Sequence, residues 1–487
     1  MEEGSSAGEP VQSKALSPGP ASPNDDCARA QASHRARVLA AACVCQLMVV
    51  LDISVVNVAL PRIDHALAFS PASLSWVVNA YTLAFAGLLL LGARVADLVG
   101  HRRTMTSALV FFGIASMLGG LAHTPTQLIA ARAAQGAAAA VLAPVTLVVI
   151  MATFEEGAPR RRAIATWGMV QASGSAVGVL LSGVLTEYLN WRWVLYVNIP
   201  FVVAGLVLAL GSVRNLSSRT RTELDVPGAV LATASMTLLA YGCVNAGEHG
   251  WADGTTAGSL ALAVITFGAF LATERRARHP LVRLQVIKSR SVAIASVLMT
   301  FVGGATVTSF YFASLFLQNV LGYSPVRTGL AFLPFSVGIA LATMASSVMV
   351  ERLGPRRLIT SGLVLAGVGF ILFARLDVDS GLGTFLLPVA PASLGIGATI
   401  APILNLGTSG ADRHEAGMVS GLLNTSRQAG GSVALALLVT MATRVTARSS
   451  PSGLHALAQG YRVAFVLDAV LLLSGAVVSG TILRPRR

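Results

Sequence analysis

VLAAACVCQLMVVLDISVVNVAL, residues 38–60, is an almost continuous apolar run that contains one charged side chain, Asp52. A helix of about 20 apolar residues spans the roughly 30 Å hydrocarbon core of a bilayer, so this run predicts a membrane-spanning helix. A charged aspartate at the centre of such a helix costs about 2.5–3.5 kcal/mol on insertion scales, and it is a functional candidate by default. The rest of the chain narrows what Asp52 does.

The composition shows that residues 38–60 are typical of the whole chain. Of the 487 residues, 54% are hydrophobic and 12% are charged, whereas soluble domains carry about 25% charged residues. Apolar runs of similar length lie near 39–60, 74–92, 105–122, 127–151, 163–186, 193–212, 226–245, 256–273, 292–316, 326–349, 358–375, 384–405, 417–441 and 462–483. We therefore predict an all-α membrane protein with 14 transmembrane helices.

The basic residues are distributed unevenly between alternate connections. Fourteen spans place both termini on one side of the membrane, and 26 of the 35 Lys and Arg residues lie on that side. Positive charge collects in cytoplasmic loops, which predicts a multi-pass protein of the cytoplasmic membrane with both ends in the cytoplasm. Because the net charge of +13 is spread over separate loops, we expect no nucleic-acid binding.

Two short connections share a pattern that indicates an internal duplication. DLVGHRR (97–103) and ERLGPRR (351–357) keep an acid, a glycine and two arginines at the same spacing. The alternative is a topology signal alone, which explains the arginines but not the matched acid and glycine. A second repeated sequence, Gly-Met-Val, begins at Gly168 and at Gly417. The duplication predicts two pseudo-symmetric halves with a substrate path at their interface.

The domain boundaries follow from this duplication. Residues 1–37 are rich in Ser, Pro, Gly and Ala and predict a disordered cytoplasmic tail. Residues 38–212 form the first six-helix half, and residues 292–487 form the second. Residues 213–291 then hold two inserted helices with their flanking cytoplasmic loops.

Several of these segments resemble the major facilitator superfamily, in particular its fourteen-span drug:proton antiporters. LDISVVNVALP (51–61) is similar to the signature of that branch, and WRWVLYVNIP (191–200) is also typical of it. LIAARAAQG (128–136) resembles the motif associated with proton transfer. The fifth span resembles the antiporter motif through its glycines, although Val179 and Ser182 stand where that motif has proline and glycine. These glycines are Gly174, Gly178 and Gly183.

The resemblance implies the major facilitator fold and alternating access, with two gating loops that hold neighbouring helices together in one conformation. In physical terms, an acid at a helix end can accept from arginine and from backbone N–H groups, and a glycine permits a tight reversal. The gating residues are Asp97, Gly100, Arg102, Arg103, Glu351, Gly354, Arg356 and Arg357.

Arg132 is the strongest candidate partner for Asp52. At 1.5 Å per residue, Arg132 lies roughly 9 Å below the outer end of its helix, and Asp52 lies roughly 20 Å above the inner end of its own. The two charges are therefore at similar depth, as a titratable buried pair requires. We predict that Asp52 and Arg132 couple transport to protons. A static ion pair that only joins two helices is the alternative.

Other polar or small residues in the spans are candidates for the substrate cavity. Arg427 is the polar centre of the thirteenth run and could line the cavity, contact substrate or pair with Asp468. The full set of cavity candidates is Asn57, Gln135, Gly136, Asn424 and Arg427.

The sequence argues against an enzyme or an ATP-driven pump. All eight histidines lie outside the predicted spans, and no glycine is followed by lysine as a phosphate-binding loop requires. An apolar cavity with few polar groups favours proton-coupled export of lipophilic drugs or antibiotics. The alternative is transport of another small solute (a metabolite, sugar or siderophore) by symport or facilitated diffusion. We expect a monomer in the lipid bilayer that uses protons as its coupling ion, with no metal and no other cofactor.

Overall fold

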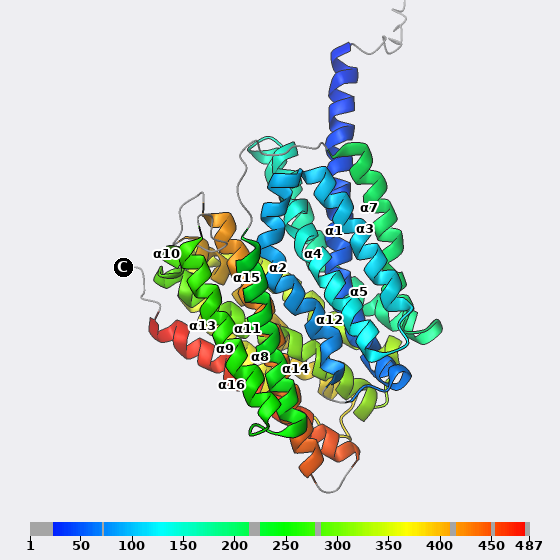
Figure 1. Ribbon diagram of the computed structural model, residues 1–487, viewed down its shortest axis with the longest axis vertical. Helices are drawn as coiled ribbons and strands as arrows, with labels where there is room; N and C mark the ends of the chain where they lie inside the picture. The colour runs from blue at the N-terminus through cyan, green and yellow to red at the C-terminus, as the bar shows by residue number, and fades with distance from the viewer. Residues whose placement is uncertain are drawn as a thin grey trace, which may run out of the picture.

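The computed structural model describes residues 23–70, 73–213, 225–277, 284–409, 415–449 and 453–482. These residues form helices joined by short turns and arranged as two bundles (Figure 1). The first bundle contains α1 (Pro23–Leu67), η1 (Ser73–Ser75), α2 (Trp76–Val99), α3 (His101–Gly120), α4 (Pro125–Thr153), α5 (Ala158–Tyr188), α6 (Trp193–Tyr196) and α7 (Asn198–Ser212).

The remaining helices form the insertion and the second bundle. The insertion consists of α8 (Val226–His249) and α9 (Gly254–Arg276). The second bundle contains α10 (Leu284–Ile287), α11 (Arg290–Leu315), the π-helical turn η2 (Phe316–Val320), α12 (Pro325–Leu353), α13 (Pro355–Phe373), α14 (Leu382–Thr408), α15 (Ala416–Arg448) and α16 (Leu454–Ile482).

The membrane-spanning pattern agrees with the sequence. Thirteen helical segments among the described residues are long and apolar enough to cross a membrane, and each coincides with a predicted run. The remaining run, near 105–122, is α3, a helix of 20 residues that packs against α4 and α7. It begins with His101-Arg102-Arg103, which lowers its mean hydropathy. The all-helical fold is confirmed.

Two element boundaries differ from the expectation. Residues 23–37, expected within a disordered tail, belong to α1, which projects beyond the neighbouring helices (Figure 1). This stretch is rich in Ala and Arg, which are good helix formers, so the helix continues outward from the apolar run. Residues 1–22 of the predicted tail lie outside the described residues. The run 193–212 is divided into α6 and α7 at Val197, three residues before Pro200, which lies in the first turn of α7.

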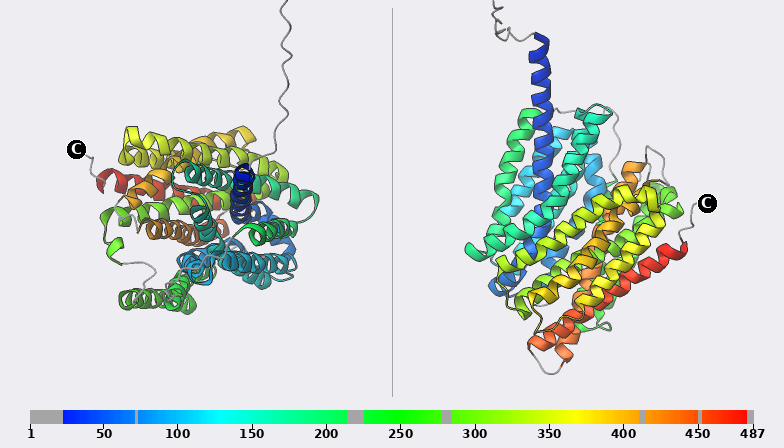
Figure 2. Two further views of the ribbon diagram at one scale, coloured as in Figure 1. Left: turned by 90° about the horizontal axis from the view of Figure 1, so that it is seen from above. Right: turned by 180° about the vertical axis from the view of Figure 1, so that it is seen from behind.

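The two bundles repeat the same helix pairings, as the duplication predicts. Contacts of the first half recur between the equivalent helices of the second half, and Figure 2 shows the two bundles side by side. The equivalent pairs include α1–α5 with α11–α15, α2–α4 with α12–α14, α3–α7 with α13–α16, and α1–α7 with α11–α16.

The halves are held together at one end of the molecule. Consecutive spans run in opposite directions, so the turns at Gly100 and Gly354 lie at one end, called here the basic end. At the opposite end, Ser314 on α11 donates to the carbonyl of Asn57 at 2.9 Å. The backbone N–H of Val326 on α12 donates to Glu187 on α5 at 2.8 Å. The conformation described here is therefore closed at the end opposite the basic end.

The inserted hairpin lies on the outside of the two bundles and covers one seam between them. α8 packs on α2 of the first half and on α15 of the second half, and α9 packs mainly on α8 (Figure 1). Thr440 on α15 donates to the carbonyl of Cys243 on α8 at 2.6 Å, and Arg444 donates to the carbonyl of Ala246. α8 thus joins the two halves along the α2–α15 seam.

Candidate functional site

Asp52 and Arg132 meet in the centre of the first half. Asp52 is 0% exposed and Arg132 is 2% exposed, and an Arg132 Nη1–H donates to Asp52 Oδ2 at 2.6 Å. α1 supplies the carboxylate and α4 the guanidinium, in agreement with the similar depth expected from the sequence. The two charges form a fully buried ion pair.

The guanidinium of Arg132 is also held by α2. Its Nε–H donates to the carbonyl of Val77 at 3.1 Å, and its Cζ lies 4.4 Å from the centre of the Tyr81 ring. A cation over an aromatic face gains about 2 kcal/mol when both are removed from water. These contacts fix the orientation of the guanidinium, so that Nη1 points at the carboxylate.

Two amides complete the surroundings of Asp52. Gln135 on α4 donates to Asp52 Oδ1 at 3.1 Å, and Asn198 on α7 donates to the same oxygen at 2.8 Å. Both amides also donate to the hydroxyl of Ser116 on α3, at 2.7 Å and 3.2 Å. Side chains of α1, α3, α4 and α7 therefore form one buried polar network.

This network surrounds the carboxylate of Asp52 with hydrogen-bond donors. Donors from one guanidinium and two amides stabilise the ionised form, because hydrogen bonds to a charged acceptor are shorter and stronger. A proton on Asp52 would remove the counter-charge of Arg132. An unpaired charge in such a dry site costs several kcal/mol, so the helices that hold the pair would have to rearrange.

The predicted cavity residues of the first half occupy different places. Gln135 is fully buried in the Asp52 network. A Cβ on Gly136 would lie 2.2 Å from the carbonyl of Tyr81, so this glycine allows α4 to approach α2 closely. Asn57 donates to the carbonyl of Ile53 on its own helix, and its backbone carbonyl accepts from α11. Contact of these three residues with substrate stays a prediction.

The candidates of the second half lie together on α15. Arg427 Nη2 donates to Asn424 Oδ1 at 3.2 Å, and both side chains are partly exposed. The carboxyl group of Asp468, with which Arg427 could pair, instead lies against Thr308, with Oδ2 and Oγ1 2.8 Å apart. The pairing of Arg427 with Asp468 is therefore absent. Polar side chains at 424 and 427 are available to a cavity.

The two gating loops have the backbone geometry expected of them. Gly100 separates α2 from α3 with φ 97°, and Gly354 separates α12 from α13 with φ 76°. Side chains rarely adopt such positive φ values, so glycine permits both reversals. In the second loop Arg356 donates to the carbonyl of Gly480 on α16, within the same half.

The other gating side chains are partly or fully exposed, except that of Asp97, which is not among the described side chains. Arg102 is partly exposed, whereas Arg103, Glu351 and Arg357 are exposed. Asp97 lies in the last turn of α2, and its side chain is outside the described set. The gating role of these loops stays a prediction.

The glycines of the fifth span allow two close helix contacts. A Cβ on Gly174 would touch Val50, and a Cβ on Gly178 would lie 2.0 Å from Ser54 Oγ, both on α1. A Cβ on Gly183 would lie 2.6 Å from the carbonyl of Pro325 on α12, in the other half. The fifth span thus packs on its own half through two glycines and on the opposite half through the third.

Sequence reasoning did not identify three members of the network: Ser116, Asn198 and Tyr81. Asn198 lies in the WRWVLYVNIP run, so a polar residue at the start of an apolar helix was a signal available for it. Ser116 and Tyr81 carry no such signal, because small hydroxyl and aromatic side chains are frequent in membrane helices.

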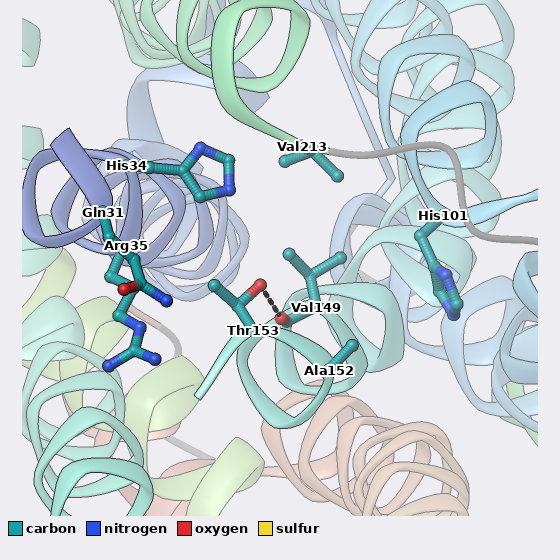
Figure 3. Close-up of a pocket in the computed structure, with 8 residues that line it drawn as sticks. All are labelled: Gln31, His34, Arg35, His101, Val149, Ala152, Thr153 and Val213. Atoms are coloured by element: carbon teal, nitrogen blue, oxygen red, sulfur yellow. Dashed lines mark hydrogen bonds between the residues drawn. The ribbon is translucent and has the colours of Figure 1, made fainter. Parts of the chain in front are cut away.

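A surface pocket lies at the basic end, away from this network. It is lined by Gln31, His34, Arg35, His101, Val149, Ala152, Thr153 and Val213 (Figure 3). His34 and Asp52 are 18 residues apart on α1, or about 27 Å along the helix axis. The pocket is therefore not the site of the ion pair. Within the described residues, no group of three or more His, Cys, Asp or Glu side chains could hold a metal ion.

Comparison with curated proteins finds related transport and resistance proteins. The chain is 42% identical to the cephamycin export protein of Amycolatopsis lactamdurans, over 91% of each chain. It is 38% identical to the puromycin resistance protein of Streptomyces alboniger, over 91% of this chain and 90% of that protein. It is 34% identical to the lincomycin resistance protein of Streptomyces lincolnensis, over 82% of each chain. These relatives are consistent with a membrane transporter and not with an enzyme.

Solved structures share the fold at low sequence identity. A bacterial homologue of the human lysosomal transporter Spinster, in an inward-facing and unoccupied conformation, has a TM-score of 0.66 and 18% identity, covering 92% of this chain and 96% of that one. The POT family transporter PepTSo has a TM-score of 0.68 and 16% identity, covering 92% and 97%. The family model of the Major Facilitator Superfamily matches residues 42–435. The chain therefore belongs to the Major Facilitator Superfamily.

Proposed function

We propose that this protein exports lipophilic antibiotics or related drugs across the cytoplasmic membrane in exchange for protons. The observation that carries the proposal is the buried pair of Asp52 and Arg132, 2.6 Å apart and surrounded by amide donors in an otherwise apolar half. A transporter that only needed to hold two helices together would do so with less costly apolar contacts. The names of the relatives, which include cephamycin export and puromycin resistance, favour antibiotics over sugars, siderophores or other metabolites.

The proposed cycle alternates access to the polar network. In the outward-open state Asp52 takes a proton from outside as the drug leaves, and in the inward-open state it loses that proton as a drug binds. Because a proton on Asp52 removes the counter-charge of Arg132, proton binding and the rearrangement of the helices that hold the pair are coupled. No cofactor other than the proton takes part.

The orientation follows from the arginine-rich connections. We place the basic end and both termini in the cytoplasm, because positive loops remain on that side. The halves are then joined at the outer end, through Ser314 with Asn57 and Val326 with Glu187. With this orientation the conformation described here is inward-facing and closed toward the exterior, and we propose that the protein works as a monomer.

Everted membrane vesicles test proton coupling directly. With an imposed pH gradient, Asp52→Asn should still bind drug but lose gradient-driven accumulation by at least tenfold, because asparagine cannot exchange a proton. Asp379→Asn is the matched control, since this carboxylate is exposed on the connection between α13 and α14. Undiminished pH-driven transport by Asp52→Asn would refute the proposed coupling.

A susceptibility panel tests the substrate class. Cells that express the intact chain should tolerate higher concentrations of puromycin, lincomycin, cephamycins or lipophilic dyes than cells that express Asp52→Asn. Equal tolerance to every compound, at equal amounts of protein in the membrane, would favour another solute.

A further inference from the structure

A second carboxylate is fully buried, in the other half of the molecule. Asp468 on α16 is 0% exposed, and its Oδ2 lies 2.8 Å from the hydroxyl of Thr308 on α11. Its Oδ1 is buried and has no hydrogen-bond partner among the described residues. Because Asp468 is fully buried and its hydrogen-bond contact lies within its own half, neither cavity lining nor a contact between the halves accounts for it.

The surroundings of Asp468 contrast with those of Asp52. Asp52 accepts from a guanidinium and two amides, whereas no ion pair or N–H donor to Asp468 occurs in the described part of the chain. An isolated carboxylate transferred to an apolar medium costs far more than a neutral polar group, and it neutralises instead. The contacts therefore favour a neutral, protonated Asp468.

The hydroxyl of Thr308 supports the same protonation state. It lies 2.8 Å from Asp468 Oδ2 and also 2.8 Å from the carbonyl of Gly304, one turn earlier on α11. A hydroxyl has one hydrogen, and a carbonyl can only accept. When Thr308 donates to Gly304, its contact with Asp468 is a hydrogen bond only if the carboxyl group donates. A proton on Asp468 thus satisfies both contacts at once.

The charged groups nearby do not replace that proton. Arg427 donates to Asn424, and Arg356 donates to Gly480, which is 12 residues, or about 18 Å, from Asp468 along α16. Tyr311 and Tyr461 are the buried tyrosines on the packed helices, and neither supplies a positive charge. The titratable side chains of α16 and the helices packed against it are Arg290, Tyr311, Arg356, Arg357, Arg427, Arg444, Arg448, His455, Tyr461 and Arg462.

The position of Asp468 matches that of Asn198 in the first half. Each residue follows an arginine of its own half by six positions, Arg192 in the first half and Arg462 in the second. Each also contacts the first span of its half: Asn198 contacts Asp52 on α1, and Asp468 contacts Thr308 on α11. In both halves, an acid and a neutral partner therefore lie on the first and sixth spans. The acid lies on the first span in the first half and on the sixth span in the second half.

We propose that Asp468 is a second proton-binding site of this protein and holds a proton in the conformation described here. The event is reversible proton binding to the carboxyl group, with no other bond made or broken. This site extends the proposed function, which then has one protonatable carboxylate in each half. Occupancy of Asp468 does not require Asp52, so the two ideas can fail separately.

Infrared spectroscopy of the purified full chain in lipid nanodiscs tests the proposal. At neutral pH the wild type should show the carbonyl stretch of a protonated carboxyl group, and Asp468→Asn should lose it. Asp377→Asn, which removes an exposed carboxylate, is the matched control and should keep the band. Thr308→Val should shift the band without abolishing it, because the carboxyl group loses its one partner. Thr308→Val therefore remains a test if Asp468→Asn does not fold.

The outcomes separate this site from Asp52. The band should persist in Asp52→Asn and should fade in one step as the pH is raised. Identical spectra for the wild type and Asp468→Asn, or no shift in Thr308→Val, would overturn the proposal for Asp468. Gradient-driven transport that survives in Asp52→Asn would instead overturn the proposed coupling and leave the band at Asp468 as it is.

Discussion

At the scale of single residues, Arg132 joins three helices of the first half through its side chain. It reaches the carboxylate of Asp52, the carbonyl of Val77 and the ring of Tyr81 with one guanidinium. Lysine could not reproduce this arrangement, because its ammonium is a compact charge without the planar fork of arginine. The residue therefore combines an electrostatic role with fixed geometry.

A double-mutant cycle tests whether Asp52 and Arg132 depend on each other. Arg132→Gln should lower the free energy of unfolding by about 3–5 kcal/mol, because it leaves a buried carboxylate without its cation. Adding Asp52→Asn to that variant should recover most of the loss, since the remaining groups are neutral. Thermal unfolding of the purified variants in one detergent measures both effects. Losses that simply add would contradict a coupled pair.

The sequence predicts the centre of this site but not its full membership. Asp52 and Arg132 are identifiable because a charge inside a membrane helix is rare and costly, and helix geometry gives its depth. Ser116 and Asn198 are ordinary polar residues, whose convergence on Asp52 depends on how α3 and α7 pack. Gln135, predicted for the cavity, contacts Asp52 because it lies one helical turn from Arg132. The sequence alone does not show how each helix is rotated about its axis, and this rotation determines which side chains face Asp52.

At the scale of helices, α5 connects the two halves through its last glycine. The carbonyl of Pro325 approaches Gly183 so closely that a Cβ would lie 2.6 Å from it. Gly168 lies about four turns earlier on the same helix, and a Cβ added there would have no neighbouring atom within 4 Å. The close approach of α12 therefore lies in the part of α5 that is opposite the basic end.

Alanine substitutions on α5 test the role of this contact in closure. Gly183→Ala should push α12 away and shift the population toward a conformation that is open at the end opposite the basic end. Gly168→Ala is the matched control, because it adds the same helix propensity of about 1 kcal/mol without a clash. Spin labels at cysteines introduced at Leu189 and Leu454 report the separation of the halves. Equal distance distributions for the two variants would contradict the account of the α5–α12 contact.

The helical framework itself follows from the sequence more fully than the site does. Apolar runs about 20 residues long define the spans, and the glycines at 100 and 354 mark two of the turns. The extension of α1 back to Pro23 was missed because composition suggested disorder, although its Ala and Arg residues favour a helix. For residues 23–37, helix propensity favours a helix and low apolar content favours disorder. These residues are helical because they continue a long apolar helix.

At the scale of the whole molecule, two similar halves carry different polar centres. The first half has an ion pair with amide donors, and the second has a carboxyl group with a single hydroxyl partner. α8 covers the α2–α15 seam between the halves, so the insertion adds a bridge that a twelve-helix arrangement lacks. The duplication thus supplies the framework, and the charges differ between its copies.

Proton release on drug binding tests the central claim most directly. A compound that the susceptibility panel identifies as exported is added to the purified transporter in weak buffer, and a pH indicator counts the protons released. The account predicts that Asp52→Asn releases about one proton fewer per bound drug than the wild type, at similar drug occupancy. The same proton count in both proteins would contradict the role of Asp52 as the coupling carboxylate.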